Sequence, residues 1–197
     1  MASTPSKKPA RERILETAVE LFYQRGIQNV GIDEIIARAG VAKMSLYNHF
    51  QSKDHLVAEF LRLQDERWQN WFFSAVERYG STPQERLLGI FDALKEWFNN
   101  PDYRGCAFVN ATVELVNPTH PGYQVALEHK RAMYQYILEL VKAANLTNAE
   151  TLARQFVLLA EGAIVVAMME GASTAAEQAR EAASVLIKSK VGCNMEM

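Results

Sequence analysis

Polar and aromatic side chains gather in one short segment, KMSLYNHF over residues 43–50. Leu46 and Phe50 supply the apolar positions that a short amphipathic helix needs for a small core. The other side chains carry an ammonium group, hydroxyls, an amide and an imidazole. Such groups hydrogen-bond phosphate oxygens and base edges in the major groove. We therefore expect contact with DNA from Lys43, Met44, Ser45, Tyr47, Asn48 and His49, and also from Lys53 just beyond them.

The elements around this segment predict a helix-turn-helix. Ile32, Ile35 and Ile36 fall on one face of a helix over about 32–39, and Ala39-Gly40-Val41 forms a tight hinge before the helix over about 43–49. A third helix, from Ala10 to Arg25, ends at Gly26. We expect a disordered arm over 1–9 and a DNA-binding domain over 10–52.

Helical periodicity continues to the end of the chain, and no alternating run indicates a strand. The pattern predicts helices over about 53–79, 83–99, 106–116, 122–144, 148–170 and 174–189. Ser52, Thr82 and Thr147 are the expected N-caps of three of them. The fold class is thus all-α, with about nine helices, in which the helix over 53–79 links the DNA-binding domain to a larger helical part over 80–197.

Composition is ordinary for a globular protein, with 49% hydrophobic and 22% charged residues. The absence of a run of about 18 apolar residues, a leader or a disulfide framework predicts a cytoplasmic protein without a membrane partner. The formal net charge is -2, but residues through His55 carry eight Lys and Arg against six Asp and Glu. This excess of basic residues lies in the segment that is expected to contact the DNA phosphates.

The chain resembles the TetR family of one-component regulators. The resemblance covers residues 10–57 and is carried by Gly40-Val41, Ser45-Leu46-Tyr47, His49-Phe50 and Lys53. It implies a homodimer, a pseudo-palindromic double-stranded operator and a small-molecule effector bound by residues 80–197. Gly31 stands where the family usually has a Thr or Ser that caps the second helix beside a phosphate. The family does not distinguish repressor from activator, and we favour a repressor.

Residues of the larger part are candidates for binding the effector. An aromatic group could line an apolar pocket, while Cys106, Asn110 and Glu114 fall on one helical stripe and could give that pocket its specificity. The full set is Trp97, Phe98, Tyr103, Cys106, Asn110, Glu114 and Tyr134. Cys106 also has an alternative role as a direct sensor of oxidants or electrophiles, since it stands at the N-terminus of the predicted helix and near Arg104.

The last two helices are apolar and rich in small residues, which suits a dimer interface built as a four-helix bundle. The residues expected there are Leu159, Gly162, Ala163 and Ala167. No metal-ligand spacing, phosphate loop or nucleophile motif predicts an enzyme or a cofactor. A helical protein that binds small molecules without DNA is the remaining alternative of a different class.

Overall fold

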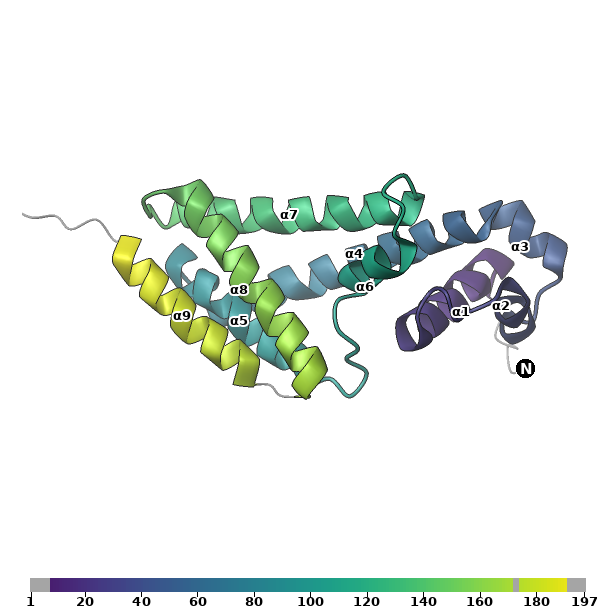
Figure 1. Cartoon of the computed structure of the whole chain (residues 1–197), viewed down its shortest axis with the longest axis horizontal. Coiled ribbons are helices and arrows are strands. Elements are labelled where there is room, and N and C mark those ends of the chain that lie inside the picture. Colours follow the sequence, from purple (N-terminus) through teal and green to yellow (C-terminus); the bar gives the residue numbers. More distant parts are fainter. Residues whose placement is uncertain (1–7, 172–173, 191–197) are drawn as a thin grey trace, which may run out of the picture. The chain divides into compact units, whose positions relative to one another are not determined.

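The computed structural model describes residues 8–171 and 174–190, and these ranges hold nine α-helices and no strand, which confirms the all-α fold. The arm expected over 1–9 lies almost wholly outside the described residues. The helices (Figure 1) are α1 (Ala10–Arg25), α2 (Ile32–Ala39), α3 (Lys43–Phe50), α4 (Lys53–Tyr79), α5 (Pro83–Phe98), α6 (Ala107–Leu115), α7 (Pro121–Ala143), α8 (Ala149–Glu170) and α9 (Thr174–Lys190).

The chain forms two compact units. The first consists of Met1–Glu66 and Ala107–Leu127, and the second of Arg67–Cys106 and Glu128–Met197. The long helices α4 and α7 contribute residues to both. The first unit therefore contains α6 and the first parts of α4 and α7 in addition to the three N-terminal helices.

In the first unit α1 packs against α2 and α3, and its apolar face is fully buried at Ile14 and Ala18. Gly40 follows α2 with φ 61°, a left-handed conformation that glycine adopts without steric cost. The Ser52 hydroxyl accepts a hydrogen bond from the His55 amide at 3.2 Å, as expected of an N-cap of α4.

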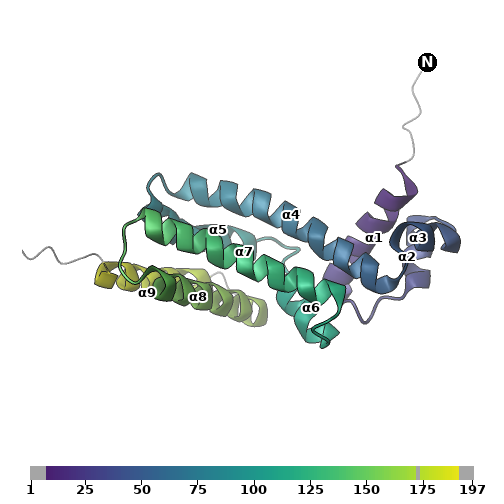
Figure 2. The same cartoon turned by 90° about the horizontal axis from the view of Figure 1, so that it is seen from above.

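In the second unit α8 and α5 pack against α9 and against each other (Figure 2). Small buried side chains such as Ala176 and Ala183 allow α9 to approach closely. The capping box expected at the start of α5 is present, because Thr82 and Glu85 each accept from the other's backbone amide. The prediction of Thr147 as a cap was wrong: Asn148 holds the N-cap position of α8 with φ 55°, and the Thr147 hydroxyl donates to the Lys190 carbonyl.

Among the described helices, α8 alone is long and apolar enough to cross a membrane by length and composition, with a mean hydropathy of 1.7. This hydropathy comes from the stretch from Phe156 to Met169, where Glu161 is the one charged residue. The expectation concerned an uninterrupted run of about 18 apolar residues, and this stretch is shorter than that. α8 packs on α5 and α9, and core helices of soluble proteins pass the same test.

Candidate functional site

The outer face of α3 carries the side chains that the sequence marks for DNA. Met44 is 68% exposed and Tyr47 39%, while Leu46 and Phe50 are buried in the core of the first unit as predicted. Ser45 and Lys53 are half-buried; Lys43, Asn48 and His49 are exposed. An eight-residue helix thus has two buried anchors and an exposed polar and aromatic face, the geometry with which a recognition helix enters a major groove.

Lys43 is held in place by an acidic neighbour on α2. Its Nζ lies 3.1 Å from Asp33 Oδ1. The hydrogen bond and the charge of Asp33 raise the pKa of Lys43 above its ordinary value. The pair is solvent-exposed, so a phosphate or a guanine edge can replace Asp33 at little cost.

Arg13 fixes the turn between α2 and α3, a role that sequence reasoning missed. Its Nη1 donates to the carbonyls of Ala39 at 2.8 Å and Gly40 at 3.1 Å. These carbonyls end α2, where a cation is favoured by the unsatisfied acceptors and the helix dipole. No local pattern marks this contact, since it joins residues 26 positions apart.

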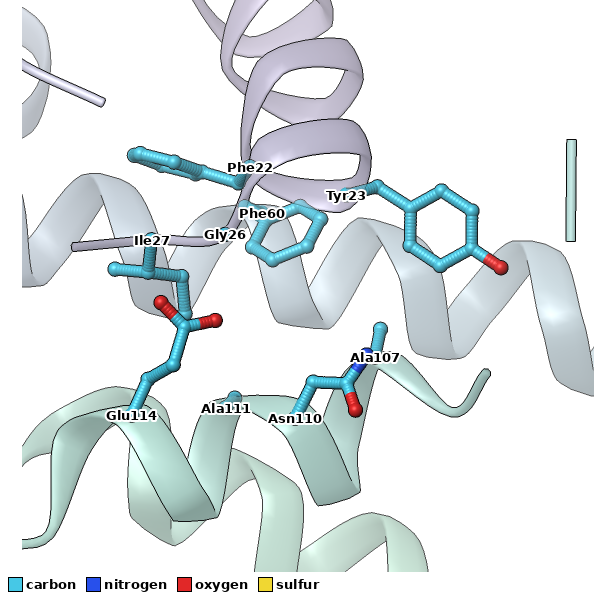
Figure 3. A pocket seen from close by; sticks show the side chains of 9 residues that line it. All are labelled: Phe22, Tyr23, Gly26, Ile27, Phe60, Ala107, Asn110, Ala111 and Glu114. Carbon is cyan, nitrogen blue, oxygen red and sulfur yellow. The ribbon is translucent and has the colours of Figure 1, made fainter. Parts of the chain in front are cut away.

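Glu114 of α6 binds the connection between α1 and α2. Its Oε2 accepts a hydrogen bond from the Gln28 amide at 2.9 Å, and its carbonyl accepts from Gln28 Nε2 at 3.3 Å. The same carboxylate closes one side of a pocket of about 80 Å³ (Figure 3). Two of the three residues expected on one stripe, Asn110 and Glu114, line this pocket, and the third, Cys106, does not. The walls are Phe22, Tyr23, Gly26, Ile27, Phe60, Ala107, Asn110, Ala111 and Glu114.

The aromatic candidates of the second unit form a connected cluster. Tyr103 lies edge-on to Trp97, with ring centroids 4.9 Å apart, and 5.2 Å from Phe98. Its hydroxyl donates to the Ile164 carbonyl at 2.7 Å, which fixes the ring. Trp68 extends the cluster, 6.0 Å from Trp97. Tyr134 has a different neighbour, because the Arg154 guanidinium lies 4.9 Å above its ring.

Cys106 meets two charged groups that the sequence did not connect with it. Lys130 Nζ lies 3.4 Å from its sulfur and 2.6 Å from Glu161 Oε1. Burial by itself lowers the pKa of Lys130, but its interactions with Cys106 and Glu161 outweigh burial and leave that pKa raised. Cys106 is 5% exposed and is not among the residues that line the pocket beside Glu114. This trio of buried Cys106 and half-buried Lys130 and Glu161 is a candidate reactive centre.

Known protein families account for most of the chain. A family model of bacterial regulatory proteins of the tetR family matches residues 14–60, and one of the tetracyclin repressor-like C-terminal domain matches residues 83–183. The chain belongs to the TetR family. The first match spans α1–α3, so the exposed face of α3 is the face of a TetR-family DNA-binding domain.

Individual transcriptional regulators agree with this assignment. The chain is 27% identical to the HTH-type transcriptional regulator YjdC of Escherichia coli over 154 residues, 78% of this chain and 81% of that protein. It is 32% identical to the repressor DhaR of Mycobacterium sp. over 110 residues, 56% and 54% of the two chains. The crystal structure of SCO4454, a TetR-family transcriptional regulator from Streptomyces coelicolor, superposes with a TM-score of 0.84 at 27% identity, covering 93% of this chain and 96% of that one.

The α8 surface of this TetR-family chain differs from the dimer face expected from sequence. Ala163 and Ala167 are buried within the protomer, Leu159 is half-buried, and only Gly162 of the expected set is exposed. A different apolar stripe faces outward at helical spacing. Its members are Leu158 at 71% exposed, Val165 and Val166 at 37%, and Met169 at 77%.

Proposed function

We propose that this TetR-family regulator is a cytoplasmic homodimeric repressor that binds a pseudo-palindromic operator through α3. The observation that carries the proposal is the α3 face, where Met44, Tyr47 and their neighbours are exposed above buried Leu46 and Phe50. In a two-fold dimer, two such helices enter successive major grooves about 34–36 Å apart, or a multiple of that distance. Lys43, Met44 and Asn48 are the proposed base readers, and Ser45, Tyr47, His49 and Lys53 the proposed phosphate contacts.

Operator binding is tested by a gel shift at fixed salt with DNA from upstream of the protein's own gene. Tyr47→Ala should weaken binding by about 1–3 kcal/mol, because it removes a contact to the DNA. Tyr79→Ala is the matched control, since Tyr79 is 44% exposed but lies in the second unit. Equal affinity of the Tyr47→Ala and wild-type proteins would exclude this face as the DNA contact.

The stripe of Leu158, Val165, Val166 and Met169 is the proposed dimer interface, with Gly162 at its centre allowing close approach. An exposed apolar stripe on a helix that already packs on α5 and α9 suits a bundle with the same helices of a second copy. Leu158→Asp should give monomers in light scattering at micromolar concentration. Val113→Asp, at a residue 73% exposed on α6, should leave the dimer intact.

We further propose that an apolar or aromatic effector binds among Trp97, Phe98 and Tyr103 and releases the operator. A ligand shifts the equilibrium between the operator-bound and the released conformation only as far as it binds one of them more tightly than the other. All three Trp residues lie in the second unit, so bound aromatic ligands should quench their fluorescence. Trp97→Leu should then reduce both ligand affinity and ligand-induced release, with operator affinity unchanged.

A second candidate function is covalent sensing through Cys106, favoured by the contact of Lys130 with its sulfur. The sulfur would bond to the β-carbon of an unsaturated carbonyl compound, and the thiol proton would end on the α-carbon. An adduct there would displace Lys130 from its pair with Glu161. Cys106→Ser should abolish release of the operator by such electrophiles; release that survives the substitution excludes this function.

A further inference from the structure

The pocket beside Glu114 has the electrostatics of a cation site. Glu114 supplies a carboxylate, and the pocket adjoins the C-terminal end of α1, which is the negative pole of the helix dipole. Among the described residues that line it, none is Lys, Arg or His. The Glu114 carboxylate and the negative end of the helix dipole, with no basic side chain among these lining residues, favour a positively charged ligand.

The remaining walls suit the apolar part of an organic cation. Phe22 and Phe60 are buried at 3% and 2% exposure, and their rings lie 5.5 Å apart on one side of the pocket. Aromatic faces attract ammonium groups as well as apolar chains. Asn110 rises from α6 beside Glu114 and adds an amide group to the same side (Figure 3).

Gly26 lies directly against the carboxylate of Glu114, so that only a residue without a side chain fits there. A Cβ at this position would lie 3.0 Å from Glu114 Oε2 and 3.2 Å from Oε1. Among the described residues, the Gln28 amide donates to Oε2 and not to Oε1, so Oε1 is the oxygen that can pair with a ligand. The pocket of about 80 Å³ is about half the size of a protein cavity that holds benzene, so it suits about three to five non-hydrogen atoms.

We propose that this pocket binds small organic cations, namely a primary ammonium group that pairs with Glu114 and a short apolar chain that packs on Phe22 and Phe60. The site is distinct from the effector site proposed among Trp97, Phe98 and Tyr103. It lies within the first unit and borders the connection between α1 and α2. Binding of the cation requires neither an operator nor the other effector, so its test is independent of the test of the proposed function.

The test is a titration of the 15N-labelled full chain with n-propylammonium chloride at constant ionic strength. The Gly26 and Gln28 amide signals should shift and saturate. Propan-1-ol has the same number of non-hydrogen atoms but no charge, and should bind at least about tenfold more weakly, because the charged hydrogen bond is missing. Propionate should not bind.

Three variants separate the site from general effects. Glu114→Gln keeps an acceptor for the Gln28 amide but should reduce ammonium binding about tenfold or more. Ala107→Leu keeps the carboxylate and should block the pocket by its bulk. Glu139→Gln, at an exposed residue of the second unit, should leave binding unchanged. Equal binding of propan-1-ol, undiminished binding in Glu114→Gln, or shifts that never saturate would each overturn the proposal.

Discussion

Replacement of Gly26 by alanine tests how the first unit is held together. Gly26 has φ 84° and ψ 153°, a region that is essentially restricted to glycine and costs other residues about 1–3 kcal/mol. The new Cβ would also lie 3.0 Å from Glu114 Oε2. The carboxylate must then move away from the Gln28 amide, which adds about 1 kcal/mol for the exposed hydrogen bond. Gly26→Ala should therefore lower the free energy of unfolding by about 2–4 kcal/mol.

The assay is urea unfolding followed by far-ultraviolet circular dichroism at a fixed protomer concentration. Tryptophan fluorescence, which reports on the second unit alone, shows in parallel whether the two units unfold together. In a Glu114→Ala background, Gly26→Ala should cost about 1 kcal/mol less, since only the backbone strain remains. A change below about 0.5 kcal/mol in the wild-type background would refute both the strain and the contact with Glu114.

Three further predictions concern other parts of the molecule. Gly31 has φ -86°, and a Cβ at this position would meet no atom within 4 Å, so a serine fits there and can cap α2. Gly31→Ser should stabilise the fold by a few tenths of a kcal/mol and tighten operator binding in a gel shift. Arg13→Met removes the donor to Ala39 and Gly40 and should cost about 1–2 kcal/mol in urea unfolding, with weaker operator binding. Burial raises the pKa of Tyr136 to about 12, so the unfolded chain loses this proton at a lower pH than the folded chain. The free energy of unfolding should therefore fall as pH rises from about 10 toward 12, and Tyr136→Phe should flatten that part of the pH–stability curve.

Periodicity and capping predicted the helices because both are local properties of the chain. The buried positions Leu46 and Phe50, the N-cap Ser52 and the capping box at Thr82 all depend on residues within one or two turns. Thr147 failed as a cap because its hydroxyl is used by Lys190, 43 residues away. A competing tertiary contact of this kind leaves no trace in the local sequence.

The candidate site was predictable to the same extent. Helical spacing placed Asn110 and Glu114 on one stripe, and both line one pocket. Their partners at the end of α1 and in the connection that follows it could not be foreseen, since Gln28 lies 86 residues from Glu114. Lys130 was missed for the same reason, because nothing in its own segment points to Cys106 or Glu161. Spacing along a helix defines a face, but only the packing of helices decides what that face meets.

The central claim, that paired α3 helices read a two-fold operator, is tested most directly by hydroxyl-radical footprinting of the wild-type protein on DNA from upstream of its gene. Protection should appear as two related half-sites whose centres lie about 34–36 Å apart along the helix axis, or a multiple of that distance, and should disappear with Tyr47→Ala. Protection without two-fold symmetry, or protection that Tyr47→Ala leaves unchanged, would contradict the account.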